Sequence, residues 1–247
     1  MIEEYALSSK SIYQILIKKG IQSFHHVNTM ATSITFIRNN ALLTRKFVED
    51  NNLPQTVQNS DPIDKEYGLW DDIFLDGLDL HQHFNRNSPY GPIMFKIDLK
   101  ILTLPDFQNV YITKDNPTNW RSKPNWDDRY YKNIEEFAKD YRNSGRVRDG
   151  QIMFTFKNCS DKIKLNKFCR EIIVDNPHIL LKDNIRSLGT LALSKIVSEL
   201  SSNKLSHIPV TLRHNENTLP FCWCVKNYGQ MQLFNKSELI LRFSSNI

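Results

Sequence analysis

The chain has 247 residues, of which 40% are hydrophobic and 24% are charged, a composition usual for a globular protein. Its 32 basic and 27 acidic residues give a formal net charge of +5, which permits an anionic partner without requiring one. No stretch approaches the roughly 18–20 apolar residues of a membrane span, and the acidic start has no secretory signal. We therefore expect a cytoplasmic protein without a membrane partner.

The sequence predicts no metal site. Four cysteines are few for this length and favour a reducing compartment over a disulfide scaffold: Cys159, Cys169, Cys222 and Cys224. Cys222 and Cys224 form a lone C-x-C, which buried apolar thiols explain better than zinc. His81 and His83 form an H-x-H without a third ligand, so a solvated loop is the favoured interpretation.

The N-terminal part predicts a helix followed by a strand. Residues 8–19 carry apolar side chains at helical spacing, and Gly20 follows as a C-terminal cap. Residues 24–26 form a brief apolar and aromatic run that is typical of a strand.

The next unit places a histidine and an arginine at its two ends. A helix is expected to begin at Asn28 or Thr29, whose side-chain oxygen can cap the free backbone amides. Asparagines at residues 39–40 can end it, because asparagine tolerates the left-handed backbone. The unit therefore begins with His26 and ends with Arg45. If the two side chains face the same cleft, both would have a function.

The rest of the chain predicts further strands and helices. Strands are expected at residues 93–99, 150–157 and 171–175, and helices at 134–143, 163–169 and 183–200. We expect an exposed loop at 46–64, an irregular surface segment at 105–132 and added edge strands within 205–247. A domain boundary is expected near residues 178–184.

Four residues suggest a ligand site, each with a plain structural alternative. His26 is more often a hydrogen-bonded structural residue at a strand end, and Arg45 more often lies on the surface. Arg45 gains a function where its guanidinium can grip a phosphate or carboxylate with two hydrogen bonds. Tyr90 and Gly91 have two interpretations. They form a simple turn, or the Tyr90 ring stacks on a flat heterocycle whose close approach Gly91 allows.

A second group combines cations with aromatic rings. Its members are Trp120, Arg121, Trp126, Arg146 and Arg148. The combination suits single-stranded nucleic acid, where bases stack on rings and phosphates are neutralised. A solvated basic turn beside core tryptophans is an equally weighted alternative.

Two nucleotide motifs are absent and one nuclease pattern is present. The eight glycines form neither a G-x-G-x-x-G nor a P-loop, so a bound nucleotide would be held in another way. Asp98 and Lys100 form a D-x-K pattern that, with Asp76, fits a metal-dependent nuclease. Because D-x-K arises often by chance at a strand end, the nuclease is the weaker alternative.

Taken together, the motifs resemble the DarT-like ADP-ribosyltransferases, toxins in which an NAD-using domain modifies nucleic acid. His26 with Asn28, Ser33-Ile34, Asn39-Asn40 and residues 42–45 resemble the opening of that domain. Residues 90–95 resemble its central strand, and residues 149–154 the segment that carries its catalytic glutamate. The resemblance covers about residues 22–177.

The resemblance implies an α+β fold in which two split sheets with flanking helices enclose an NAD cleft. Residues 1–177 would form this domain, and residues 178–247 a C-terminal extension packed on it. NAD, as substrate, would contact His26, Asn28, Arg45 and Tyr90: His26 a ribose or the nicotinamide, Tyr90 the nicotinamide face, and Arg45 the diphosphate. A protein antitoxin is also implied as a partner.

Glutamine occupies the catalytic glutamate position. Position 151 is preferred over 153 because the apolar residues after it then match the family in register. A carboxylate there would bind the nicotinamide ribose, stabilise the oxocarbenium-like charge and accept a proton. Gln151 can donate and accept hydrogen bonds but has no charge. We therefore expect the chain as written to be inactive or nearly so, as a pseudoenzyme or, preferably, as a deliberate Glu→Gln substitution.

The leading hypothesis is a mono-ADP-ribosyltransferase that modifies a base of single-stranded DNA or RNA, in a toxin–antitoxin or antiphage system. Gln151 and Arg45 would act in catalysis, and Trp120, Arg121, Arg146 and Arg148 would contact the nucleic acid. The alternatives are a transferase with a protein acceptor, the metal nuclease, and a silent module that binds NAD or nucleic acid.

Overall fold

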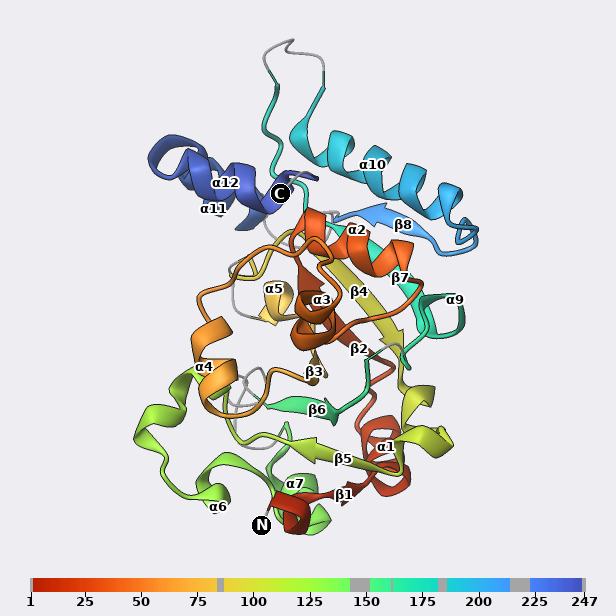
Figure 1. Ribbon diagram of the computed structural model, residues 1–247, viewed down its shortest axis with the longest axis vertical. Coiled ribbons are helices and arrows are strands. Elements are labelled where there is room, and N and C mark those ends of the chain that lie inside the picture. The colour runs from red at the N-terminus through yellow and green to blue at the C-terminus, as the bar shows by residue number, and fades with distance from the viewer. Residues whose placement is uncertain are drawn as a thin grey trace.

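The computed structural model describes residues 2–83, 87–142, 152–160, 162–181, 186–213 and 223–245. Within these ranges the fold is α+β, as predicted, with helices placed around one eight-stranded sheet (Figure 1). The strands are β1 (Leu7–Ser8), β2 (Ser23–Asn28), β3 (Asp72–Asp76), β4 (Ile93–Asp98), β5 (Asn109–Ile112), β6 (Met153–Lys157), β7 (Cys169–Val174) and β8 (Val210–Leu212). Their order is β1-β5-β6-β3-β2-β4-β7-β8, and each adjacent pair is antiparallel except β7 and β8.

The sheet is split between β2 and β3. Their pairing is limited to His25 opposite Asp76, whereas β2 and β4 pair along the whole of β2. The two predicted sheets are thus the halves of one sheet, β1-β5-β6-β3 and β2-β4-β7-β8, joined at one residue pair. The split leaves room between the halves for side chains that approach from both.

The helices surround this sheet. They are α1 (Ser9–Lys18), α2 (Met30–Arg38), α3 (Arg45–Asp50), α4 (Asp61–Glu66), α5 (Leu80–His83), α6 (Trp126–Arg129), α7 (Ile134–Asp140), α9 (Leu165–Phe168), α10 (Leu188–Ser202), α11 (Trp223–Phe234) and α12 (Lys236–Phe243). Four 3-10 helices complete the set: η1 (Ile2–Tyr5), η2 (Leu99–Thr103), η3 (Pro105–Phe107) and η4 (Pro117–Ser122). No helix in the described ranges is long and apolar enough to span a membrane.

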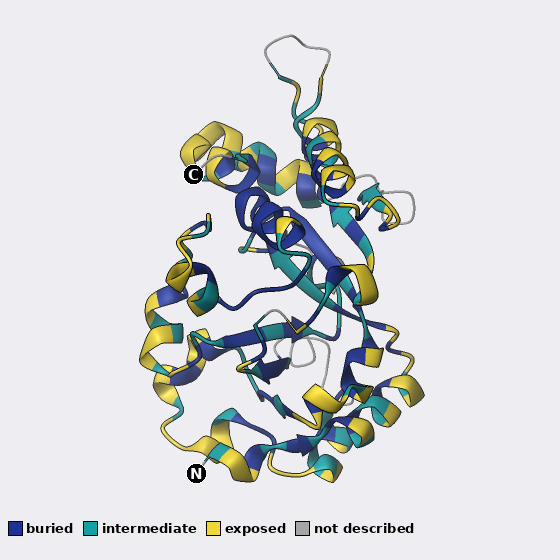
Figure 2. Ribbon diagram, turned by 45° about the vertical axis from the view of Figure 1, so that its right-hand side comes forward, coloured by how far each residue is buried: buried dark blue, intermediate teal, exposed yellow. Residues whose placement is uncertain are grey.

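The unit from β2 to α3 has the predicted order of elements, but the predicted side-chain cap of its first helix is wrong. Thr29, with extended backbone, precedes α2 and makes no side-chain cap hydrogen bond, and the helix is buried from Met30 to Ile37 (Figure 2). Asn40 has a φ of 51°, the left-handed conformation expected at the end of this helix. Thr44 then caps α3, since its hydroxyl accepts a hydrogen bond from the amide of Phe47. Arg45 is therefore the first residue of a helix.

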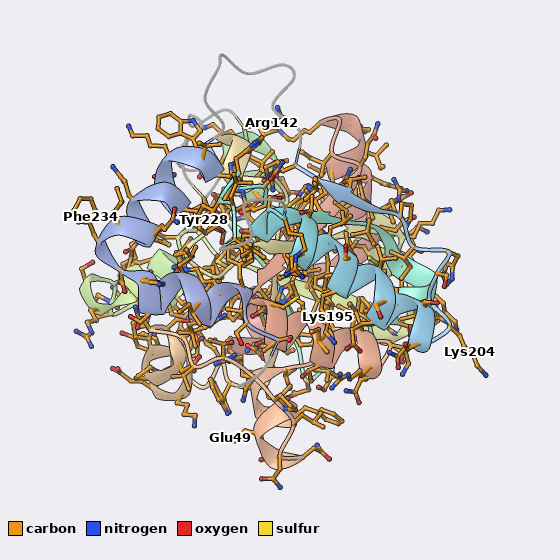
Figure 3. All side chains as sticks on the ribbon, turned by 90° about the horizontal axis from the view of Figure 1, so that it is seen from above. Glu49, Arg142, Lys195, Lys204, Tyr228 and Phe234 are labelled. Atoms are coloured by element: carbon orange, nitrogen blue, oxygen red, sulfur yellow. The ribbon has the colours of Figure 1, made fainter. Side chains whose placement is uncertain are left out.

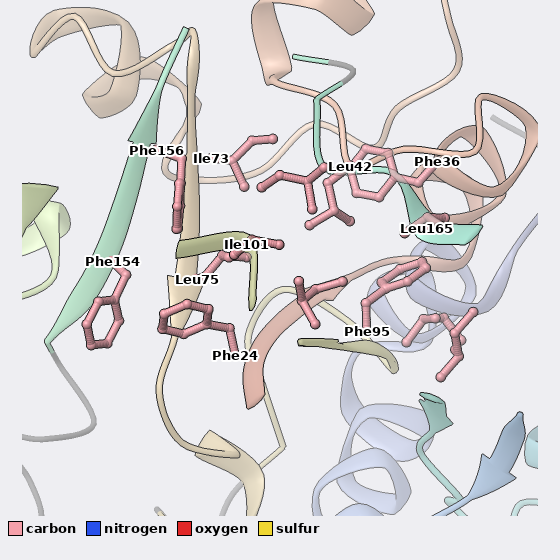
Figure 4. Close-up of a cluster of buried hydrophobic side chains, with 14 of the residues drawn as sticks. Phe24, Phe36, Leu42, Ile73, Leu75, Phe95, Ile101, Phe154, Phe156 and Leu165 are labelled. Atoms are coloured by element: carbon pink, nitrogen blue, oxygen red, sulfur yellow. The ribbon is translucent and has the colours of Figure 1, made fainter. Parts of the chain in front are cut away.

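The main hydrophobic core extends across the split (Figure 4). The Phe24 ring of β2 lies 4.7 Å from the Phe154 ring and 6.1 Å from the Phe156 ring, both of β6. On the other side of the split, Phe36 of α2 lies 6.0 Å from Phe95 of β4. Aromatic pairs of this kind contribute about 0.5–1.5 kcal/mol beyond area burial. The core thus holds the two halves together where backbone pairing is sparse.

The C-terminal residues pack on the rest of the chain. β8 extends the sheet beside β7, and both α10 and α12 contact α2. Arg38 of α2 binds both carboxylate oxygens of Glu199 in α10 at 2.9 and 3.0 Å. Viewed from above, Tyr228 points inward from α11 while Phe234 lies at the periphery (Figure 3). The division after residue 177 stays a prediction.

Three sequence expectations are wrong in part. Residues 46–64 contain most of α3 and the first part of α4, in place of an exposed loop. Residues 105–132 are more ordered than expected, because Trp120, Tyr130 and Tyr131 are fully buried. The tail adds the edge strand β8 as expected, but it also forms α11 and α12.

Candidate functional site

An inner cavity of about 100 Å³ opens where the sheet halves part. His26 and Asn28 line it from β2, and Phe74, Asp76 and Met153 from β3 and β6. Arg45, Tyr90 and Asp64 also line it. The cavity therefore brings together His26, Asn28, Arg45 and Tyr90, the four residues predicted to contact NAD.

His26 is fixed as a neutral imidazole. Its Nδ1 lies 2.9 Å from the carbonyl oxygen of Phe74, which can only accept, so Nδ1 carries the proton. Its Nε2 then accepts from the amide nitrogen of Asn28 at 3.2 Å. Burial lowers the pKa of His26, which keeps the ring uncharged near neutral pH. The amide oxygen of Asn28 accepts in turn from Gln58, so the three side chains form one connected wall.

Arg45 presents an anion-binding surface to the cavity. Its Nη2 donates to the Asp61 carboxylate and to the carbonyl oxygen of Thr56 at 3.0 Å. Its Nε and Nη1 are shielded from solvent and have no hydrogen-bond partner. A buried guanidinium with open donors is an expensive arrangement unless a ligand supplies acceptors. Phosphate oxygens match these donors well.

Three carboxyl groups, those of Asp64, Asp72 and Asp76, also line the cavity. Burial raises the pKa of Asp64 to about 7, of Asp72 to about 6 and of Asp76 to about 8. Asp72 is paired with Lys157 at 2.6 Å, and Ser60 hydrogen-bonds Asp64. Asp76 Oδ1 is buried and has no hydrogen-bond partner. Asp76 is thus the carboxylate of this group that lacks compensation.

Tyr90 and Asn116 line both the inner cavity and an outer cavity of about 650 Å³. Tyr90 is half-buried, and the burial of its hydroxyl raises the pKa of that group. Gly91, with a φ of 140°, lies where a Cβ would come within 2.5 Å of the Asn28 carbonyl oxygen. The close approach predicted at Gly91 is therefore to the backbone that begins α2. The outer cavity is lined by polar and apolar groups alike and is also walled by Arg242 of α12.

The predicted nucleic-acid contact by Trp120 is wrong in this structure. Trp120 is completely buried and packs against Tyr67 and Tyr130, with the Arg129 guanidinium 5.2 Å above its ring. No face remains open to a base, so Trp120 is a core residue. Arg121 next to it is exposed and stays a candidate.

Three predicted residues lie outside the described ranges, so the structure neither supports nor contradicts their roles. They are Gln151, Arg146 and Arg148. The nearest described neighbour of position 151 is Ile152, which is fully buried, and Met153 after it lines the inner cavity.

The nuclease residues do not meet. Asp98 lies opposite Ser23 on one side of β2, and Asp76 lies opposite His25 on the other. Asp98 also pairs with Arg170 at 2.9 Å and caps η2, while Lys100 is exposed. This separation by a whole strand argues against a shared metal between the two carboxylates.

A buried cluster that sequence reasoning missed lies outside the inner cavity. His81, Asp175 and Cys224 gather there, so His81 is not on a solvated loop. Asp175 already binds Arg213 at 2.8 Å and the Tyr228 hydroxyl at 2.9 Å. The Cys224 sulfur is nearly equidistant from the two His81 ring nitrogens, at 3.4 and 3.7 Å, and so lies along the lone pair of neither. The contacts fit a structural network.

Sequence reasoning also missed Asp64, Asn116 and Gln58 as cavity residues, and it assigned Asp76 to a different chemistry. For Asp76, the only available signal was an acidic residue that ends an apolar strand. The others reach the cavity from loops and α4, where no periodic pattern indicates their direction.

Comparison with known proteins finds similar solved structures, including two of DarT. No protein-family model and no curated protein matches the chain. One structure is Thermus sp. 2.9 DarT in complex with NAD+, at 12% identity and a TM-score of 0.46, covering 78% of this chain and 96% of that one. The other is Thermus sp. 2.9 DarT in complex with ADP-ribosylated ssDNA, at 11% identity and a TM-score of 0.45, covering 80% and 96%. Both bear the name of the family that the sequence motifs resemble.

Proposed function

We propose that this chain is an NAD-dependent mono-ADP-ribosyltransferase whose acceptor is a base of single-stranded DNA or RNA. The observation that carries the proposal is the joint placement of His26 and Arg45 in one cavity, with two Arg45 donors unpartnered. The family motifs require these two residues at the ends of one sequence unit, and neither a G-x-G-x-x-G nor a P-loop offers another nucleotide site.

The proposed roles follow from the charges. Arg45 Nε and Nη1 hold the diphosphate, and Tyr90 lies against the nicotinamide ring. His26 positions Asn28 and the edge of β3 through its two hydrogen bonds. The bond between nicotinamide and ribose C1 breaks and its electron pair leaves with the nicotinamide nitrogen. A base nitrogen then bonds to C1 and releases its proton, which passes to the carboxylate in the Gln151→Glu variant and to water in the chain as written.

The glutamine at position 151 is expected to slow the transfer of ADP-ribose. Its amide can hydrogen-bond a ribose hydroxyl, but it can neither accept the proton nor offset positive charge at C1. We propose that turnover is lower than in the Gln151→Glu variant by about 10²–10³-fold, the usual cost of losing one such electrostatic group.

The biological part of the proposal rests on the family resemblance alone. The chain would act as a toxin in a toxin–antitoxin or antiphage system, with a protein antitoxin as partner. We place this action in the cytoplasm, where the thiols of Cys159, Cys169 and Cys224 would remain free.

The test identifies the acceptor. The Gln151→Glu variant is incubated with labelled NAD and either single-stranded DNA, RNA or a cell lysate. If nuclease removes the label and protease does not, the result supports a nucleic-acid acceptor. Label with the opposite sensitivity supports the protein-directed alternative, and label on no acceptor at all would sink both. A parallel reaction with a chelator tests the nuclease alternative. That alternative predicts nucleic-acid cleavage that depends on a divalent ion and not on NAD.

A further inference from the structure

We propose that the Asp76 carboxylate is the anionic group that faces the cationic nicotinamide end of NAD and so fixes the direction in which NAD lies. The inference rests on the proposed function and adds a residue and an orientation to it.

Asp76 occupies the point where the sheet halves part. It is the last residue of β3 and lies opposite His25 of β2, in the one residue pair that joins the halves. On its other side it lies opposite Met153, the first residue of β6. Asp76 and Met153 both line the inner cavity, so the carboxylate is held by two strands beside the space that a ligand would fill.

Asp76 has no ion-pair partner among the described residues. Its Oδ1 is shielded from solvent and accepts no hydrogen bond from them, whereas Asp72 four residues earlier is paired with Lys157. Within the described ranges Arg45 pairs through Nη2 with Asp61 and not with Asp76, and its Nε and Nη1 have no hydrogen-bond partner there. A buried carboxylate without a partner is costly, and such groups in native proteins usually await a ligand, an ion or a proton.

The distribution of charge in the cavity matches one orientation of NAD. The pyridinium ring is the cationic part of the molecule, and the diphosphate is its anionic part. Arg45 offers open donors at one part of the wall, and Asp76 offers an uncompensated carboxylate at another. If the nicotinamide lies toward Asp76 and the diphosphate toward Arg45, each charge of NAD faces an opposite charge of the protein. In the reverse orientation, like charges face each other.

Asp76 also bears on the missing charge at position 151. In the antiparallel register Asp76 faces Met153, two residues after Gln151 in sequence. Burial raises the pKa of Asp76 to about 8, and a cation beside the carboxyl group favours its ionised form. With glutamine at position 151, the ionised Asp76 can still favour the positive nicotinamide–ribose end. Binding of NAD therefore does not require the missing glutamate.

The test compares NAD+ with NADH, whose nicotinamide ring is uncharged. Isothermal titration at pH about 8 measures both ligands against the full chain, Asp76→Asn and the matched control Asp98→Asn, which lies outside the cavity. We expect Asp76→Asn to weaken NAD+ binding about tenfold, the usual size of one charge-assisted contact, and to leave NADH binding unchanged. Asp98→Asn should change neither.

Each other outcome contradicts the inference in a recognisable way. An equal loss for both ligands would mean that Asp76 acts through a charge-independent contact, and no loss for either would remove Asp76 from the site. If neither ligand binds the unsubstituted chain, the proposed function itself fails. Asp76→Ser must reproduce the Asp76→Asn result, and thermal melts must show both variants folded, which separates a lost charge from a lost fold.

Discussion

The imidazole of His26 donates from Nδ1 to the carbonyl oxygen of Phe74 at 2.9 Å and thereby bridges β2 and β3 beside the split. Backbone pairing between these strands is limited to one residue pair, so a side chain supplies part of the connection. The same ring lines the inner cavity and holds Asn28 through Nε2. His26 thus connects β2 to β3 at the split and also forms part of the wall of the proposed NAD site.

His26→Phe keeps a ring of similar size beside Phe36, 5.7 Å away, but leaves the Phe74 carbonyl and the Asn28 amide without their partner. We expect the free energy of unfolding to fall by about 1–3 kcal/mol, the cost of leaving buried polar groups unpaired. Urea denaturation measures this. His207→Phe at an exposed position is the control and should stay within about 0.5 kcal/mol of the parent. An unchanged midpoint for His26→Phe would contradict the bridging role.

Arg45→Ala should weaken NAD+ binding about 10–100-fold, because at least one charge-assisted contact is lost. Arg45→Lys should give an intermediate loss, since lysine keeps the charge but not the planar fork. Titration calorimetry with Arg170→Ala as control checks both, as Arg170 pairs with Asp98 outside the cavity. Equal affinity in the Arg45→Ala and Arg170→Ala variants would remove Arg45 from the site.

Asp76 should make the protein less stable as pH rises. Burial raises its pKa from 3.8 to about 8 in the folded state, so between these values the folded chain holds a proton that the unfolded chain has released. The free energy of unfolding therefore falls from pH about 4 to pH about 8 through this group. Asp76→Asn removes the effect, and its melting temperature should exceed that of the parent at pH about 8.5 by more than at pH about 5. A constant difference across that range would contradict the assignment.

Substitutions of Trp120 and Arg121 should have different effects, on stability for Trp120 and on nucleic-acid binding for Arg121. Trp120→Ala empties a buried site and should cost about 3–5 kcal/mol of stability. Arg121→Ala, on an exposed side chain, should leave stability nearly unchanged and reduce the slope of log affinity against log salt for single-stranded DNA by about 0.7. A salt slope identical to that of the parent would exclude Arg121 from the interface.

Periodic stretches were predictable from the sequence. Alternation along residues 150–157 predicted a strand there, observed as β6 over Met153–Lys157 within the described residues. Helical spacing predicted α1, and the expectation that asparagine ends α2 is confirmed by the left-handed Asn40. These features depend on neighbours in the chain, which a sequence displays directly.

Features that depend on distant partners were not predictable. Trp120 is buried because Tyr5 and Leu69, from far along the chain, complete its small core. Asp76 was grouped with Asp98 as a metal ligand, but only the strand register shows that β2 lies between them. The predicted pairing of His26 with Arg45 in one cavity did form, because the short unit between them constrains both ends.

The mass of a single-stranded oligonucleotide after incubation with NAD and the Gln151→Glu variant tests the central claim most directly. We predict a gain of one ADP-ribose unit with release of nicotinamide, a rate about 10²–10³-fold lower for the chain as written, and a loss of the gain when Arg45→Ala is added. Oligonucleotides of unchanged mass, DNA and RNA alike, together with undiminished NAD would contradict it.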